Sequence, residues 1–285
     1  MASLQGIKGR MKSIDSTKQI TNAMNLVATA KLSKSRVRVT QTRPFFNTVQ
    51  ETIHSIISHT KGVSHPFLIS NKVDHATFIV VASDLGLCGG YNANVCKLAL
   101  QEMQLKSNTS LITIGKKARE YFKARNVEIA EEIIGISESP TYIHAVEIAG
   151  NAIEAYKKGE TGAVYFVYTS FESVIAHEPK VVQLLPLNPE EFKLDVKGQG
   201  SLMNYDPSPE AVLDYVIPKY ITSVIYGGMV ESAASEQGAR MTAMSAATEN
   251  AEEMMDDLTV EYNRARQGAI TQELSEIVGG AEALK

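Results

Sequence analysis

Residues 208 to 285 have the sequence of one very long helix. Ser208, Pro209 and Glu210 supply an N-cap, a proline at the first helical position and an early acid, which together mark the start of a helix. At about 1.5 Å per residue this helix would extend roughly 115 Å, whereas a compact domain of about 130 residues has a diameter of roughly 36 Å. It therefore has to protrude from the domain that carries it. It also needs a partner, because helix propensity alone does not hold a helix of this length.

Within this segment, apolar and small residues recur with the spacing of a coiled coil. They alternate at intervals of three and four residues, which places them on one narrow stripe of the helix. The stripe consists of Met241, Met244, Thr248, Ala251, Met255, Leu258, Tyr262, Ala265 and Ala269. It predicts contact with a single partner helix.

Residues 3 to 58 supply the predicted partner. The heptad begins clearly, at Leu4, Ile7, Met11 and Ile14. The apolar pattern then resumes after a slip in register, at Ile20, Met24 and Val27. Strict heptad positions are occupied by polar residues, namely Lys18, Thr21 and Asn25. The seam of the pair is therefore expected to be unusually polar.

The two ends of the chain carry opposite charge. Residues 1–43 contain nine Lys or Arg and a single Asp, whereas residues 206–285 contain fourteen Asp or Glu and five Lys or Arg. A basic helix can also be an arm that binds nucleic acid, but this one has no interleaved aromatic residues. The complementary charges favour antiparallel pairing of the two terminal helices, with no nucleic-acid partner.

Between these helices, strand and helix signals alternate. Strands are expected at residues 76–82 and 110–114, helices at 91–106 and 116–125, and a third helix from a Ser139-Pro140 cap to about Lys158; the β-rich runs 164–171 and 174–185 are candidates for an antiparallel hairpin. The fold class is thus α/β, a long antiparallel two-helix coiled coil with an inserted Rossmann-like domain. The expected divisions are a coiled-coil helix (1–60), a linker (61–75), the α/β domain (76–190), a connecting loop (191–207) and the second coiled-coil helix (208–285).

A glycine-rich turn from Ser83 to Asn92 follows the first expected strand. Such a turn can cradle phosphate, which would suit a nucleotide-binding α/β enzyme. However, its glycines do not spell G-x-G-x-x-G or a P-loop, and no acid, base or nucleophile set accompanies them. We interpret it as a tight structural turn. Cys88 and Cys96 match no zinc or redox spacing, so no cofactor and no metal site are expected.

Neither an uninterrupted apolar run of about 18 residues nor a charged segment followed by an apolar block at the start is found. The sequence therefore predicts no membrane span and no signal peptide, and it favours a cytoplasmic location.

Several blocks resemble the gamma subunit family of bacterial F-type ATP synthases. They are Ile7-Lys8, Gln19 to Met24, Ser83-Asp84, Gly86 to Asn92, Glu236-Gln237, Ala239 to Met241, Tyr262 to Gln267 and Ile270 to Glu273. The resemblance runs from end to end. It implies a non-catalytic rotor that carries torque between a membrane c-ring and a hexamer of alpha and beta subunits, coupling ion translocation to ATP synthesis or hydrolysis.

The resemblance also implies partners and contact residues. Those that match positions contacting the catalytic hexamer are Met24, Glu236, Arg240, Arg266, Gln267 and Thr271, and those that match the foot on the c-ring are Met203, Tyr205 and Asp206. An epsilon subunit is expected near the α/β domain, and the complex is expected at the cytoplasmic side of the cell membrane.

The chain departs from the family pattern at two positions. Asn22 and Leu85 stand where the family usually has basic residues.

Small and polar side chains such as Ala28, Thr29 and Ser33 suit a shaft that turns in a bearing, because large apolar contacts would favour one resting angle. The other interpretation of the paired helices is a stand-alone coiled-coil scaffold, which would form a discrete homo-oligomer.

Overall fold

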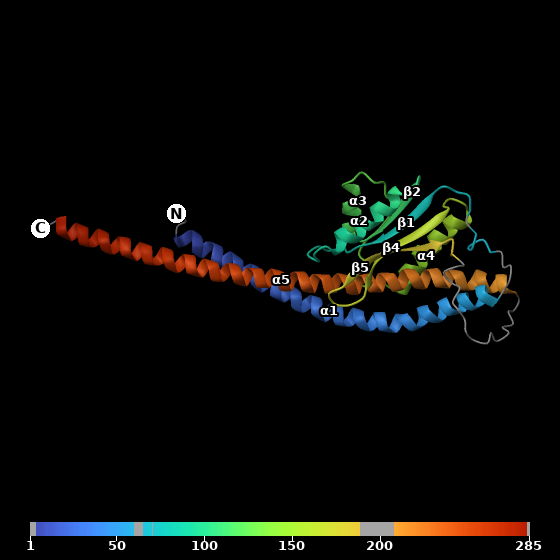
Figure 1. The fold of residues 1–285 in the computed structure, drawn as a ribbon, viewed down its shortest axis with the longest axis horizontal. Coiled ribbons are helices and arrows are strands. Elements are labelled where there is room, and N and C mark those ends of the chain that lie inside the picture. Colours follow the sequence, from blue (N-terminus) through green and yellow to red (C-terminus); the bar gives the residue numbers. More distant parts are fainter. Residues whose placement is uncertain (1–3, 60–64, 70, 189–207, 284–285) are drawn as a thin grey trace. The chain divides into compact units, whose positions relative to one another are not determined.

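The computed structural model describes residues 4–59, 65–69, 71–188 and 208–283 (Figure 1). Its elements, in chain order, are α1 (Leu4–His59), β1 (Ala76–Val81), α2 (Tyr91–Gln104), β2 (Thr109–Ile114), α3 (Lys116–Lys123), β3 (Glu131–Ile133), α4 (Tyr142–Lys157), β4 (Ala163–Phe171), β5 (His177–Leu185) and α5 (Pro209–Ala283).

Helix α5 begins at the residue that the sequence predicts. The backbone N–H of Ala211 donates to Ser208 Oγ at 3.2 Å, and Pro209 is the first helical residue. This satisfies one of the free N–H groups at the start of the helix. The helix continues through Pro218, so the predicted start and the predicted continuity are both confirmed.

The chain's contacts divide it into two compact units. The terminal unit comprises the two chain ends, up to Ala28 and from Met241, and the sheet unit comprises residues 29–240. Helices α1 and α5 each contribute to both units.

The seam of the terminal unit follows one strict heptad on α1. Every position of this heptad is buried or half-buried, and its members are Leu4, Ile7, Met11, Ile14, Lys18, Thr21, Asn25 and Ala28. The expected slip in register is wrong, because Ile20 is 59% exposed and Val27 is 54% exposed. A slip would require a local change in how the two helices wind around each other, and polar side chains fill the seam instead. Ala28, expected on the shaft surface, lies buried in the seam.

Two contacts fix the direction of the helices in the terminal unit. Thr21 Oγ1 lies 2.7 Å from Thr248 Oγ1, and Lys18 Nζ lies 2.9 Å from Glu252 Oε1. A step toward the N-terminus of α1 is therefore a step toward the C-terminus of α5, so the pair is antiparallel, as the charges predict. The expected stripe on α5, from Met241 to Ala269, is buried or half-buried at every position.

The sheet unit is built on five strands in the order β3-β2-β1-β4-β5. Strands β1, β2, β3 and β4 are parallel, and β5 is antiparallel to β4, with Phe171 opposite His177 at the turn. The candidate hairpin is therefore confirmed. Strand β3 was not predicted, because its three residues, Glu131, Glu132 and Ile133, give no apolar run.

The start of α4 differs from the prediction. Thr141, rather than Ser139, is the N-cap, and its side chain accepts from the backbone N–H of His144. The His144 side chain in turn accepts from the Thr141 backbone N–H, which completes a capping box. The Ser-Pro pair precedes the helix instead of opening it.

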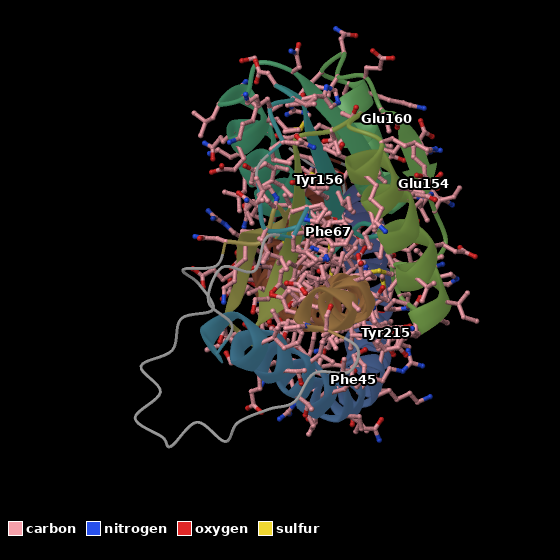
Figure 2. All side chains as sticks on the ribbon, turned by 90° about the vertical axis from the view of Figure 1, so that its right-hand side faces the viewer. Phe45, Phe67, Glu154, Tyr156, Glu160 and Tyr215 are labelled. Atoms are coloured by element: carbon pink, nitrogen blue, oxygen red, sulfur yellow. The ribbon has the colours of Figure 1, made fainter. Side chains whose placement is uncertain are left out.

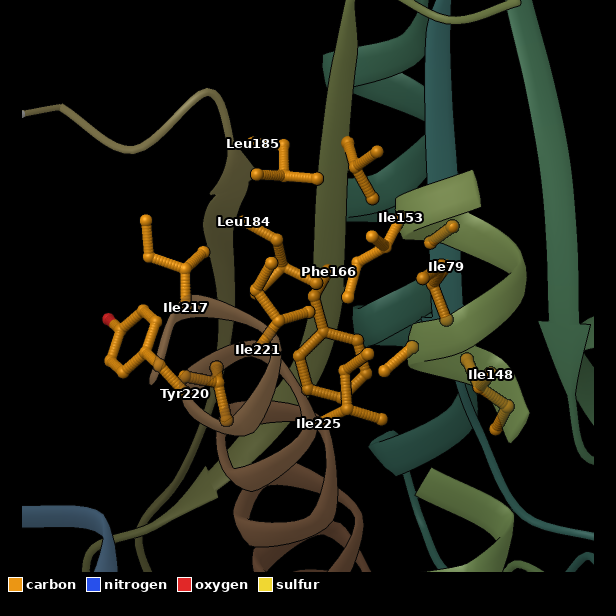
Figure 3. Close-up of a cluster of buried hydrophobic side chains, with 14 of the residues drawn as sticks. Ile79, Ile148, Ile153, Phe166, Leu184, Leu185, Ile217, Tyr220, Ile221 and Ile225 are labelled. Carbon is orange, nitrogen blue, oxygen red and sulfur yellow. The ribbon is translucent and has the colours of Figure 1, made fainter. Parts of the chain in front are cut away.

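Both faces of the sheet are covered. All six residues of β1 are buried; Phe78 and Val80 pack with α2 and α3 on one face, whereas Ile79 and Val81 pack with α4 and α5 on the other. Figure 3 shows the second face, where Phe166 belongs to one cluster with Ile148 of α4 and with Ile221 and Ile225 of α5. Parallel sheets are typically buried in this way. This section of α5 is thus part of the domain core.

Candidate functional site

The C-terminal part of α5 presents an uncovered apolar surface. Every described residue from 271 to 281 is exposed. Five large apolar side chains between residues 260 and 278 are 48% to 70% exposed, namely Val260, Ile270, Leu274, Ile277 and Val278. Exposed apolar residues that gather on one element mark a surface for a partner. The expectation of a shaft surface made only of small and polar residues does not describe this part.

Three predicted contact residues lie in the same stretch. Arg266, Gln267 and Thr271 are all exposed. The Thr271 hydroxyl donates to the Gln267 carbonyl oxygen at 2.9 Å, and positions four apart share one helix face. Met24, on α1, is half-buried. The terminal unit therefore offers these side chains, fully or in part, to a partner.

Glu236 and Arg240 have a different setting, inside the sheet unit. Arg240 Nη2 lies 2.8 Å from Glu236 Oε1, and their side chains are only 8% and 3% exposed, respectively. Arg240 Nη2 also donates to the Gly86 carbonyl oxygen at 3.2 Å. The pair therefore joins α5 to the glycine-rich turn, and the chain's own atoms cover it.

The glycine-rich turn is held by side chains of its own. Asn92 Oδ1 accepts from the backbone N–H and the hydroxyl of Ser83, both at 2.9 Å. Leu87 and Gly89 have φ values of 60° and 54°, a region that costs a non-glycine residue about 1 kcal/mol or more. The interpretation as a tight structural turn agrees with this geometry.

Asp84 ties the turn to the ends of two other strands. Its carboxylate accepts from the backbone N–H of Lys116 at 3.1 Å, of Gly135 at 3.0 Å and from the Ser137 hydroxyl at 2.8 Å. Burial alone would raise the pKa of Asp84, but these hydrogen bonds to the charged form outweigh it and leave the pKa below its ordinary value. The charged carboxylate thus stabilises the turn.

The hydroxyl and thiol groups near the turn are poor nucleophiles. Tyr91 donates its hydroxyl to the Ser232 carbonyl oxygen at 3.1 Å, and burial raises its pKa well above the ordinary value. Cys88 and Cys96 are free and buried. Burial raises the pKa of both thiols, that of Cys96 to about 12, so neither forms a thiolate readily.

Within the described residues, no group of three or more His, Cys, Asp or Glu side chains could hold a metal ion. Among those same residues, no helix has the length and apolar character needed to cross a membrane. The predicted contacts to a c-ring, Met203, Tyr205 and Asp206, lie outside the described part of the chain.

Sequence reasoning missed two features of the site. The first is the set of links from the turn to Ser137 and Ser232, for which isolated serines gave no signal. The second is the uncovered apolar end of α5, which the pair Ile277-Val278, beyond the last heptad position, could have indicated.

Three comparisons place this chain among known proteins. The sequence profile of the family described as ATP synthase matches residues 3–284. The chain is 50% identical to the ATP synthase gamma chain of Alkaliphilus metalliredigens, covering 99% of each chain. It is 44% identical to the sodium ion specific ATP synthase gamma chain of Acetobacterium woodii, covering 99% of this chain and 98% of that one.

The fold also resembles solved structures. A chain of the Euglena gracilis mitochondrial ATP synthase, in an OSCP/F1/c-ring structure, matches with a TM-score of 0.73 and 19% identity, covering 99% of this chain and 94% of the other. A chain from the rotor of the same enzyme matches with a TM-score of 0.67 and 19% identity, covering 94% and 98%. At this identity the likeness concerns the fold.

Proposed function

Because the chain belongs to the family of ATP synthase gamma chains, we propose that it is the central rotor shaft of an F-type ATP synthase. In this role it carries torque between a membrane c-ring and a catalytic hexamer of alpha and beta subunits, and it catalyses no reaction itself. The complex lies at the cytoplasmic side of the cell membrane, and an epsilon subunit accompanies the sheet unit.

The uncovered apolar end of α5 carries this proposal. A helix that exposes Val260, Ile277 and Val278 to water gains about 25 cal/mol for each Å² of apolar surface that a partner covers. The inside of a hexamer would cover this surface on all sides. An enzyme that used the glycine-rich turn for a nucleotide would leave the same surface unexplained.

Exposure supports the proposed contact roles. Arg266, Gln267 and Thr271 face outward on α5, and we assign them, with Met24, to direct contact with the hexamer. Glu236 and Arg240 are covered by the chain itself, so we assign them to positioning of the glycine-rich turn, through which they affect coupling. Met203, Tyr205 and Asp206 stay proposed contacts to the c-ring.

The mechanism is a coupling of conformational equilibria by rotation. An asymmetric shaft contacts each beta subunit in turn, and a contact that differs in free energy between the open and closed states shifts that subunit's equilibrium. A charged and an amide side chain, Arg266 and Gln267, can make angle-dependent hydrogen bonds of this kind.

The proposal is tested in the reconstituted complex with Arg266→Ala and Gln267→Ala together. We expect ATP hydrolysis to become uncoupled from ion transport and the torque to fall. A matched control removes the same side-chain types in the sheet unit, with Arg36→Ala and Gln104→Ala, which are also exposed. Unchanged coupling and torque in the first variant would refute the contact role. Failure of the chain to assemble with alpha and beta subunits would refute the rotor function.

A further inference from the structure

A groove runs between α1 and α4 in the sheet unit, with α5 beneath it. Its hollow, of about 390 Å³, is lined by Arg38, Gln41, Thr42, Phe45, Tyr142 and Tyr226. Figure 2 shows α4 beside α5 and α1 below both, with Phe45 projecting from α1. Tyr142 of α4 and Tyr226 of α5 meet edge to face, with ring centroids 5.8 Å apart, and they form an aromatic floor.

The walls of the groove are apolar and uncovered. Phe45 on α1 is 50% exposed and Tyr142 on α4 is 37% exposed, and both line the hollow. Val146 is also exposed and lies four residues beyond Tyr142, on the same helix face. Exposed apolar side chains from two helices that border one hollow form a continuous patch, and such a patch favours a partner.

The α1 edge of the groove is basic. Lys34, Arg38, Gln41 and Phe45 follow one another at intervals of four, three and four residues and so form one stripe. Lys34 and Arg38 are exposed, and neither makes an ion pair with a described residue. One turn earlier, Lys31 pairs with Glu138, which ties α1 to the segment that precedes α4 and closes this end of the groove.

We propose that this groove binds an amphipathic helix of a partner protein, with its apolar side on Phe45, Tyr142 and Tyr226 and with acidic residues along the edge formed by Lys34 and Arg38. Helix-in-groove recognition places anchors at positions i, i+3 or i+4, and i+7. The stripe from Lys34 to Phe45 spans about 17 Å, or roughly three helical turns, which is enough for such a set of anchors.

Charge decides the kind of partner. An acidic helix is attracted by Lys34 and Arg38, whereas a second copy that docked through the same face would bring its own basic edge of α1 and would be repelled. The inference does not depend on the proposed rotor function, because it uses only contacts within the sheet unit.

The first test measures binding of the full-length chain to a designed peptide by fluorescence anisotropy. The probe is a labelled helical peptide of about 18 residues with leucines at i, i+3, i+4 and i+7 and glutamates on both flanks. A second peptide has lysine in place of every glutamate. We expect the glutamate peptide to bind at least about tenfold more tightly, with an affinity that falls as salt is added.

Substitutions in the chain test whether the peptide binds in the groove. Lys34→Glu with Arg38→Glu is expected to reverse the preference between the two peptides, and Phe45→Ser, in the lining of the groove, is expected to weaken the binding of both by about tenfold. Ile175→Ser is the control, because Ile175 is a more exposed apolar residue of the same unit outside the groove. Equal binding of the two peptides, or an unchanged preference in the charge-reversed variant, would overturn the proposal.

The second test uses the purified native complex with a photo-crosslinking amino acid at Gln41. A cross-link to a helical segment of another subunit, with apolar anchors flanked by Asp or Glu, is expected. A cross-link to a second copy of this chain, to a non-helical segment, or to nothing at all would overturn the proposal. Assembly and ATP hydrolysis of the same complex report on the rotor function separately.

Discussion

Thr21 and Thr248 place their hydroxyl oxygens 2.7 Å apart across the seam of the terminal unit. Each hydroxyl also lies within hydrogen-bond distance of a carbonyl oxygen of its own helix, at Lys18 and at Met244. A hydroxyl has one proton, so one threonine donates across the seam while the other donates to its own helix. A shift of either helix would lose the bond across the seam, so the pair favours this register.

This relationship predicts a non-additive pair of substitutions. Thr21→Val alone removes the partner of Thr248 across the seam and should lower stability by about 1 kcal/mol, whereas Thr21→Val with Thr248→Val keeps the shape and should be neutral or stabilising. Thermal unfolding of the full chain by circular dichroism, with amide hydrogen exchange near both positions, gives the coupling energy. Additive effects would show that the two hydroxyls act independently.

The seam also shows what hydrophobic periodicity can predict. Leu4, Ile7 and Met11 were correctly placed, because apolar residues at heptad spacing are buried by any partner helix. The pattern failed at Ile20, where the apolar residue is exposed and Lys18 and Thr21 occupy the seam instead. A regular helix keeps its register even where the residues in it are polar, and a pattern that follows apolar residues alone does not capture this.

In the sheet unit, local signals predicted the strands that have apolar runs and the turn that has glycines. The short strand β3 was not predicted, because it is an edge strand of Glu131, Glu132 and Ile133 that pairs through its backbone. The burial of Glu236 and Arg240 was not predicted either, for a related reason. Their pairing at four residues apart was readable, but burial against Gly86 depends on how the sheet packs on α5, which no local pattern contains.

Two neighbouring glycines on α5 are predicted to respond in opposite directions to alanine. A Cβ at Gly227 would meet no atom within 4 Å, whereas a Cβ at Gly228 would lie 2.3 Å from Phe166 Cε1. Gly227→Ala should therefore stabilise the chain by up to about 1 kcal/mol through helix propensity. Gly228→Ala should destabilise it by about 1–3 kcal/mol, because α5 and β4 must move apart.

Urea denaturation of both glycine variants measures this difference. Each variant is the other's control, since the chemical change and the helix are the same. A loss of stability in Gly227→Ala as large as in Gly228→Ala would contradict the close approach of α5 to Phe166.

Removing one partner of the ion pair of Glu236 and Arg240 is predicted to lower stability strongly. Replacing both partners with apolar residues is predicted to lower it much less. Arg240→Met leaves a buried carboxylate without its cation, which should cost about 3–5 kcal/mol, whereas Glu236→Leu with Arg240→Met should cost much less. Denaturation of the three proteins measures the order. A double variant no more stable than the single one would contradict it.

The pH dependence of Arg240→Met follows from the same burial. Burial raises the pKa of Glu236, and Arg240 opposes this shift, so the shift should grow when the arginine is removed. The folded state then holds a proton that the unfolded state loses above about pH 4.5. Stability of the variant relative to the wild type should therefore fall as the pH rises from about 4.5. A difference that is constant with pH would contradict this account.

His177 is predicted to make stability fall in mild acid. Its ring nitrogens are buried, its Cε1 lies where a Cβ on Gly238 would approach to 2.7 Å, and its ring centroid is 6.4 Å from that of Phe171. Burial lowers the pKa of His177, and the Val174 carbonyl partly offsets this. Below about pH 6.5 the unfolded chain therefore binds a proton that the folded chain does not bind, and the free energy of unfolding falls.

Urea denaturation between pH 8 and pH 5 tests this through the free energy of unfolding. Relative to His177→Leu, the wild type should lose up to about 1.4 kcal/mol for each pH unit below about 6.5, until the folded histidine also protonates. His144→Gln is the control, because glutamine keeps the capping box of α4 and leaves His177 in place, so it should retain the wild-type slope. If His177→Leu also retains that slope, the titration belongs to another group, and the packing of the hairpin on Gly238 does not sense pH.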